Sequence, residues 1–247
     1  MEFRNTYEDR RRASAYDELD LSGTYGLVFR ALPELLQQYV QGRRAVDFGC
    51  GTGRSTRFLQ SLGFSTRGLD ISREMVAIAR RRDPEGEYLV IGDGDFSALP
   101  RGGFDLVQSA FTFDNIPGFE RKARIFSGLG MLLSAEGILL NIVSTPEIYT
   151  HEWVTFSTRD YPENRAAQCG DVVRIATTDY SDARPVEDIV WPHEDYLRVY
   201  RDAGLEVVRV ERPLARGDEG IAWKSETSVA PWAIYLLRAM AGRQVSM

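Results

Sequence analysis

Between residues 45 and 144, short apolar runs alternate with stretches in which apolar residues recur every three or four positions. The short runs are typical of buried strands and the periodic stretches of amphipathic helices. Strands are predicted to begin at Ala45 and to cover 66–69, 88–91, 104–110 and 138–143. Because the runs are continuous rather than strictly alternating, we expect a parallel sheet covered on both faces. The chain is therefore predicted to form an α/β fold with an open, doubly wound sheet and ligands at the carboxyl ends of its strands.

Local signals place the helix ends. Ser72 is typical of an N-cap, and Pro33 is expected to begin an earlier helix. Ala135-Glu136-Gly137 is expected to turn the chain into the strand at 138–143. The predicted helix faces are residues 35, 36 and 39; 58, 59 and 62; 75, 78 and 79; 125, 129 and 132; and 196, 197 and 200. After a stop at Gly204, strands are expected at 205–210 and 232–237.

We expect a single domain over 1–247, because no linker or repeat divides the chain. Residues 1–40 are predicted to form an N-terminal helical cap, 41–144 the ligand-binding core, and 193–247 the last part of the sheet. Residues 145–192 are polar, aromatic and irregular, and an insertion of that length is usually functional or structured in its own right. We interpret it as a lid over the substrate.

The stretch Ala45–Ser55 carries the strongest chemical signal. Gly49, Gly51 and Gly53 alternate directly after the first strand, where glycine lets a ligand lie against the backbone. A dinucleotide-binding fingerprint needs G-x-G-x-x-G, but Arg54 occupies the third glycine position. The pattern is G-x-G-x-G instead. An NAD enzyme is therefore the weaker reading.

This glycine pattern resembles the first motif of the class I S-adenosylmethionine-dependent methyltransferases, and the chain is similar to their small-molecule, ubiquinone/menaquinone type. Further elements match in order: Asp70, Gly92-Asp93-Gly94 and the segment 109–117. The resemblance covers about 45–144 well and the C-terminal strands loosely. It implies a Rossmann-like, seven-stranded, mostly parallel sheet whose last strand runs antiparallel between the fifth and the sixth. It also implies S-adenosylmethionine as the cofactor.

The resemblance assigns roles to these positions. The backbone at Gly49 and Gly51 would hold the methionine part of the cofactor, and Asp47 would anchor its amino group, directly or through water. Asp70 would accept the ribose hydroxyls, and Asp93 would bind the adenine amino group. The remaining expected cofactor contacts are Tyr16, Tyr25, Cys50, Gly53, Ile71, Met75, Gly92, Gly94, Ser109 and Ala110. Ile71 and Met75 are equally consistent with core packing.

The acceptor is expected beside the segment 109–117. Phe111, Asp114 and His151 are the candidate catalytic residues, with His151 of the lid as the general base. The segment lacks the Asn/Asp-Pro-Pro-aromatic signature of base amino-methyltransferases and the Pro-Cys of cytosine C5 enzymes. No metal is expected. Further aromatic candidates for the acceptor pocket are Phe113, Tyr149, Trp153, Phe156, Trp191 and Trp223.

Charge and composition narrow the range of possible functions. The net charge of −6 argues against a long basic face for nucleic acid or anionic lipid. Two cysteines, a charged N-terminus and no apolar window of membrane-spanning length indicate a cytoplasmic protein. We expect a monomer or homodimer that methylates an N or O atom of a small aromatic or heterocyclic metabolite, as in natural-product biosynthesis. An RNA or protein methyltransferase and a non-catalytic cofactor-binding subunit remain alternatives.

Overall fold

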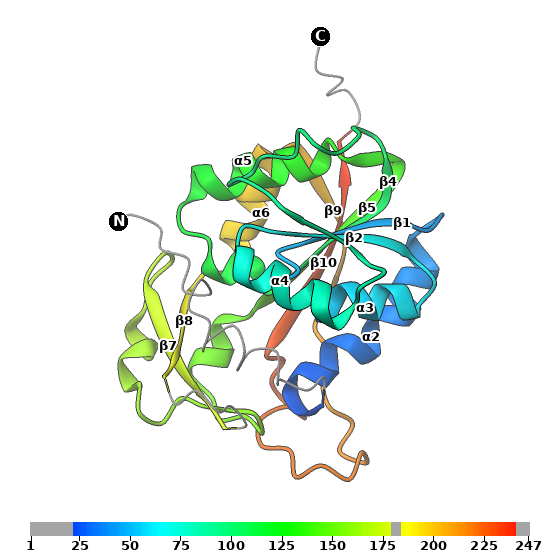
Figure 1. Ribbon diagram of the computed structural model, residues 1–247. Helices are drawn as coiled ribbons and strands as arrows, with labels where there is room; N and C mark the ends of the chain where they lie inside the picture. Colours follow the sequence, from blue (N-terminus) through cyan, green and yellow to red (C-terminus); the bar gives the residue numbers. More distant parts are fainter. Residues whose placement is uncertain (1–21, 179–183, 241–247) are drawn as a thin grey trace.

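The computed structural model describes residues 22–178 and 184–240. Within them, one sheet has the strand order β3-β2-β1-β4-β5-β10-β9 (Figure 1). β10 is antiparallel to both of its neighbours, and the other pairs are parallel. The predicted doubly wound sheet with its last strand between the fifth and sixth is confirmed. The strands are β1 Arg44–Phe48, β2 Ser65–Asp70, β3 Glu87–Val90, β4 Phe104–Ala110, β5 Leu133–Ser144, β9 Leu205–Glu211 and β10 Trp232–Ala239.

Helices cover both faces of this sheet. α5 and α6 share one hydrophobic cluster with it, and α2 and α3 share the other. α4 packs against β2 and β3 near one edge. The predicted N-cap Ser72 accepts a hydrogen bond from Met75 N at 3.2 Å. The helices are α2 Gly23–Tyr39, α3 Arg54–Ser61, α4 Arg73–Arg82, α5 Phe119–Gly130 and α6 His193–Asp202.

Two predicted boundaries are wrong. Pro33 does not begin a helix but lies within α2, which starts at Gly23. The buried face of α2 includes Leu32 and Leu35 on either side of the proline, so packing outweighs the lost backbone bond. Residues 135–137 do not precede the fifth strand but lie inside β5, where the register with β4 shifts. They form an irregularity in a strand rather than a turn before it.

The insertion 145–192 has secondary structure of its own. It contains β6 Phe156–Ser157, β7 Val172–Thr177 and β8 Val186–Ile189, an antiparallel sheet, together with the 3₁₀ turns η3 Pro146–Tyr149 and η4 Pro162–Ala166. Its buried apolar side chains, apart from Trp191, belong to the same hydrophobic cluster as those of α2. In Figure 1, β7, β8 and the N-terminal end of α2 lie on the side toward which the parallel strands run. The insertion is thus packed beside the carboxyl edge of the central sheet.

The buried carboxylate of Glu226 joins three parts of the chain at this edge. It accepts hydrogen bonds from Thr24 Oγ1 of α2 at 2.7 Å, from Val154 N of the insertion at 2.7 Å, and from Lys224 N at 2.9 Å. The side chain is fully buried. A carboxylate in this position holds α2, the insertion and the segment before β10 together.

We therefore expect Glu226→Ala to lower the free energy of unfolding by about 3 kcal/mol, because it leaves buried donors without an acceptor. Urea unfolding measures the change. Glu136→Ala, at an exposed position, is the control and should stay within about 0.5 kcal/mol of the wild type. A Glu226→Ala protein as stable as this control would contradict the interpretation.

No helix among the described residues has the length and apolar character needed to cross a membrane.

Candidate functional site

The backbone conformation of the turn after β1 requires glycine. Gly49, Gly51 and Gly53 all have positive φ, at 71°, 55° and 82°. A Cβ on Gly49 would lie 2.7 Å from Thr112 Cβ, and one on Gly53 would lie 2.8 Å from the Tyr88 ring. Only glycine therefore combines this backbone path with this packing. The turn leads directly into α3.

Asp70 at the end of β2 organises the same turn. One carboxylate oxygen accepts a hydrogen bond from Gly51 N, and the other accepts one from Ser72 N, both at 2.8 Å. Burial is the main cause of the raised pKa of Asp70, and the two backbone donors oppose it. Each oxygen retains further acceptor capacity. Asp70 thus presents a fixed carboxylate to the cavity that it lines.

Asp47 was predicted to anchor the cofactor amino group, directly or through water. It is fully buried and accepts hydrogen bonds from Ser55 Oγ at 2.6 Å, Thr56 Oγ1 at 2.7 Å and Gln108 Nε2 at 3.3 Å. It does not belong to the cavity wall. Burial raises the pKa of Asp47. The direct contact with a cofactor amino group is therefore not supported; Asp47 holds the first turn of α3 against β1 and β4.

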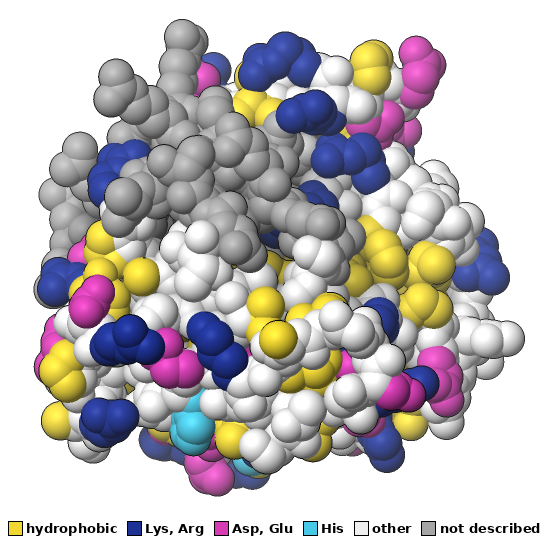
Figure 2. Space-filling model, turned by 90° about the horizontal axis from the view of Figure 1, so that it is seen from below, with side chains coloured by type: hydrophobic (Ala, Val, Ile, Leu, Met, Phe, Trp, Pro, Cys, Tyr) yellow, Lys and Arg dark blue, Asp and Glu magenta, His cyan; other side chains and the backbone are white. Residues whose placement is uncertain are grey.

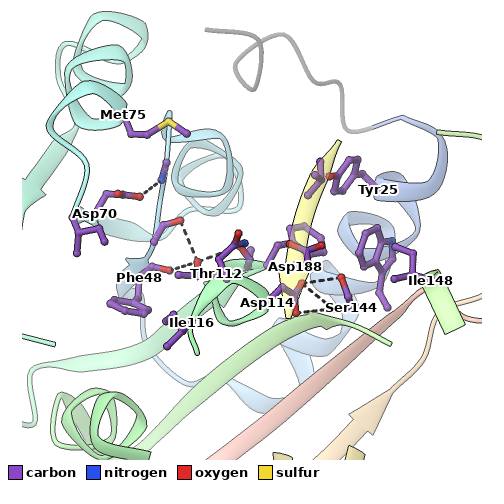
Figure 3. A pocket seen from close by; sticks show the side chains of 18 of the residues that line it. Tyr25, Phe48, Asp70, Met75, Thr112, Asp114, Ile116, Ser144, Ile148 and Asp188 are labelled. Carbon is purple, nitrogen blue, oxygen red and sulfur yellow. Dashed lines mark hydrogen bonds between the residues drawn. The ribbon is translucent and has the colours of Figure 1, made fainter. Parts of the chain in front are cut away.

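A single cavity extends from the glycine turn to the insertion. It has about 1090 Å³ of empty space, including open solvent at its mouth. Figure 3 shows Asp70 and Met75 toward one end, and Asp114, Ser144, Asp188 and Tyr25 toward the other. We call these the Asp70 end and the Asp114 end.

Eleven of the predicted site residues line this cavity: Tyr25, Gly49, Gly51, Asp70, Ile71, Met75, Asp93, Ala110, Phe111, Asp114 and Phe156. Asp93 forms ion pairs with Arg121 and Arg124, both at 2.9 Å. Phe111 has φ 61°, the one positive value at a non-glycine position among the described residues. Backbone strain of this kind concentrates at functional sites.

The structure does not bring the other predicted residues to the wall: Asp47, Cys50, Gly53, Gly92, Gly94, Ser109, Phe113, Tyr149, His151, Trp153, Trp191 and Trp223. Cys50 packs with Val76 and Tyr88 behind the turn, and the side chain of Ser109 is buried in the sheet. Tyr16 lies outside the described residues. Gly53 is needed for the turn rather than for contact.

His151 does not belong to the cavity wall. Its Nδ1 lies 3.1 Å from Glu147 O and 3.1 Å from Thr150 Oγ1, within its own turn. The structure thus gives this imidazole local partners, and its role as general base stays a prediction.

Several of the residues that line the cavity were not predicted from the sequence. Trp232 begins β10 and stacks on Tyr25, with ring centroids 5.3 Å apart; Phe111 and Phe156 lie 4.7 and 5.9 Å from its ring. We call Tyr25, Phe111, Phe156 and Trp232 the aromatic wall. Asp188 on β8 was also missed, because the sequence places two acidic residues side by side, Glu187 and Asp188, and only the structure shows that Asp188 is the buried one. Other unpredicted lining residues are Phe48, Thr112, Asn115, Ile116, Arg121, Ser144, Ile148, Ile175 and Val186.

The Asp114 end contains buried ionisable groups. Asp114 accepts hydrogen bonds from Ser144 N at 3.0 Å and Ser144 Oγ at 2.8 Å. Lys122, fully buried behind it, donates to Phe113 O and lies 4.8 Å from the Trp191 ring centre. Burial raises the pKa of Asp114 and lowers that of Lys122, while their mutual attraction opposes both shifts. Within the described residues no group of three His, Cys, Asp or Glu side chains is arranged to hold a metal ion.

Comparison with known proteins shows what the chain is similar to. Residues 46–141 match the family model described as a methyltransferase domain. A methyltransferase of Bacillus licheniformis is 31% identical over 133 residues, which cover 51% of this chain and 60% of that protein. Residues 46–141 are thus a methyltransferase domain, and the chain is similar to the class I S-adenosylmethionine-dependent methyltransferases. The matched region spans less than two thirds of the Bacillus protein.

Two further relatives of this methyltransferase are informative. A ubiquinone biosynthesis O-methyltransferase of Burkholderia pseudomallei is 26% identical over 193 residues, covering 72% of each chain. The structure of the CcbJ methyltransferase from Streptomyces caelestis superposes with a TM-score of 0.65 at 17% identity, covering 96% of this chain and 99% of that one. At that identity the likeness concerns the fold alone. S-adenosylmethionine is the cofactor of the family.

Proposed function

We propose that this methyltransferase transfers the methyl group of S-adenosylmethionine to an N or O atom of a small aromatic or heterocyclic metabolite. The observation that carries the proposal is the single cavity, which joins the glycine turn and Asp70 to the aromatic wall. Methyl transfer is an in-line displacement and needs donor and acceptor in contact. One continuous cavity meets that requirement.

The Asp70 end fits the cofactor. Asp70 would accept the ribose hydroxyls with the acceptor capacity left by its two backbone donors. The backbone at Gly49 and Gly51 allows close approach, since a side chain at Gly49 would collide with Thr112. Ile71 and Met75 offer apolar contacts to the adenine, with Asp93 nearby in the wall. When bound, the cofactor supplies an electrophilic methyl group on a sulfonium.

The Asp114 end fits the acceptor. The aromatic wall gives a flat molecule faces to pack against, and the side chains of Ile148, Ile175 and Val186 add apolar surface. The name of the Burkholderia relative, a ubiquinone biosynthesis O-methyltransferase, supports an acceptor with a ring. The chain's contribution to the reaction would then be alignment of the acceptor and exclusion of water.

The insertion would serve as the lid. Five of its residues, Ile148, Phe156, Ile175, Val186 and Asp188, line the Asp114 end, and Glu226 ties it to α2.

A macromolecular acceptor would need a more open approach. Figure 2 shows hydrophobic side chains gathered near the centre of one face, with both basic and acidic side chains around them. This mixed charge favours a small acceptor over a polyanion.

The test measures S-adenosylhomocysteine by mass spectrometry after incubating the purified chain and S-adenosylmethionine with a panel of small acceptors, a tRNA pool and a peptide pool. We expect product with small acceptors only. Calorimetry with S-adenosylhomocysteine establishes that the protein is competent to bind. Product with RNA or peptide alone, or tight cofactor binding without turnover on any acceptor, would refute the proposal; the second result would indicate a non-catalytic subunit.

A further inference from the structure

The charged groups of the cavity wall are unequally distributed. Among the described lining residues, four are aspartates and one is an arginine, Arg121. Arg121 is paired with Asp93. Two aspartates, Asp114 and Asp188, belong to the Asp114 end, where the acceptor is expected. The wall of the acceptor space is therefore negatively charged as well as aromatic.

These two carboxylates come from different elements and are held in place. Asp114 lies in η2 Thr112–Asn115 and is oriented by Ser144 through both its backbone N–H and its hydroxyl. Asp188 lies in β8 and accepts a hydrogen bond from Tyr149 Oη at 3.0 Å. Both are close enough to Lys122 to act on its ionisation. Rigidly placed groups of this kind are typical of binding and catalytic sites.

Burial makes the ionised form of these two carboxylates energetically unfavourable unless a positive charge lies nearby. Only 4% of Asp114 and 9% of Asp188 is exposed, and an ionised carboxylate removed from water needs compensation. Lys122 behind the wall is a single charge between two carboxylates. A positively charged group inside the cavity would interact favourably with both, and the faces of the aromatic wall would also favour it. A neutral hydroxyl would gain less, and a carboxylate would be repelled.

We propose that the acceptor is a small amine that binds as its ammonium ion, held by Asp188 and Asp114 beside the aromatic wall. The inference rests on the proposed function and names the acceptor class for the same cavity. The cavity defines the site, and the two carboxylates determine what it selects.

The chemistry balances with Asp114 as the proton acceptor. An ammonium ion has no lone pair, so one N–H bond first breaks and its proton passes to the Asp114 carboxylate. The freed nitrogen lone pair then forms the N–CH₃ bond while the C–S bond breaks and its electron pair stays on sulfur. The products are a methylated ammonium ion and a neutral thioether, and the proton on Asp114 later passes to solvent. Burial raises the pKa of Asp114, which makes it a better base for this step.

The first test compares the binding of amine, hydroxyl and carboxylate derivatives of the same parent compound. The full chain, saturated with S-adenosylhomocysteine, is screened by calorimetry and thermal shift against sets in which a ring-containing frame carries an amine, a hydroxyl or a carboxylate. We expect the amines to bind at least tenfold more tightly than the matched alcohols, and the carboxylates to bind more weakly still. Equal binding, a preference for alcohols or carboxylates, or no amine among the binders overturns the inference. Cofactor binding is measured separately. Failure of this inference can then be told apart from failure of the proposed function.

The second test distinguishes binding of the ammonium group by Asp188 from proton transfer to Asp114. With an amine found in the screen, Asp188→Asn should raise KM at least tenfold, and Asp114→Asn should lower kcat about 100-fold, while both still bind S-adenosylhomocysteine. Glu187→Gln is the matched control, because Glu187 is the exposed neighbour of Asp188 on β8 and pairs with Arg174. Folded Asp188→Asn and Asp114→Asn proteins that behave like this control would exclude the assignment.

Discussion

Asp70→Ala is expected to lower the affinity for S-adenosylmethionine and S-adenosylhomocysteine at least 100-fold. The carboxylate is proposed to accept both ribose hydroxyls, and each hydrogen bond to a charged group contributes about 1.5–3 kcal/mol. A loss of about 3 kcal/mol corresponds to roughly 100-fold in the dissociation constant. The substitution also removes the acceptor of Gly51 N and Ser72 N, so the glycine turn loses part of its support. Isothermal calorimetry measures the effect.

Two further proteins make this result interpretable. Asp70→Asn keeps one oxygen acceptor and the shape of the side chain, and should retain an intermediate affinity. Asp95→Ala removes an exposed carboxylate that does not line the cavity, and should bind like the wild type. Thermal unfolding shows that each protein is folded. A folded Asp70→Ala protein with unchanged affinity would remove the basis for placing the cofactor at this end.

Gly49→Ala is expected to cost about 3 kcal/mol of stability and to abolish detectable cofactor binding. The left-handed backbone alone costs an alanine about 1–2 kcal/mol, and overpacking against Thr112 adds about 1–3 kcal/mol. To accommodate the methyl group the turn must move, and the surface offered to the cofactor moves with it. Urea unfolding and calorimetry on the same samples measure the two effects.

Gly63→Ala provides the matched control. Gly63 also has positive φ, at 87°, but no atom lies within 4 Å of the place where its Cβ would be. It should show the conformational cost alone, with normal cofactor binding. Adding Thr112→Ala to Gly49→Ala should recover part of the lost stability, because it removes Oγ1 and Cγ2, the two nearest of the three atoms in collision. Equal effects of Gly49→Ala and Gly63→Ala would show that the collision is unimportant.

Much of the backbone was predictable because its signals are local. The strand at 104–110, the N-cap Ser72 and the glycine turn are all encoded in consecutive residues, and the structure contains each of them. The position of Asp70 follows equally directly, since it ends the predicted strand at 66–69. The errors arose where packing opposed a local preference. Pro33 is a helix-starting signal, yet the apolar face of α2 continues through it.

The acceptor side was less predictable for a different reason. His151 and Asp114 were both chosen by residue type and approximate location, but only Asp114 lines the cavity. Trp232 and Tyr25 stack across more than two hundred positions of sequence, and no local pattern announces such a contact. Asp47 illustrates the same limit, because its three hydrogen-bond partners, and not its place in the motif, direct it away from the cavity.

The sequence by itself determined the order of strands and helices, the glycine turn and the carboxylate that ends β2, because period, turn chemistry and capping act between neighbours in the chain. Only the tertiary structure decided which side chains share the acceptor space. Asp114, Asp188 and Trp232 belong to three separate elements, and they meet only because the insertion and β10 pack against the same edge of the sheet. Burial of apolar surface drives that packing without regard to distance along the chain.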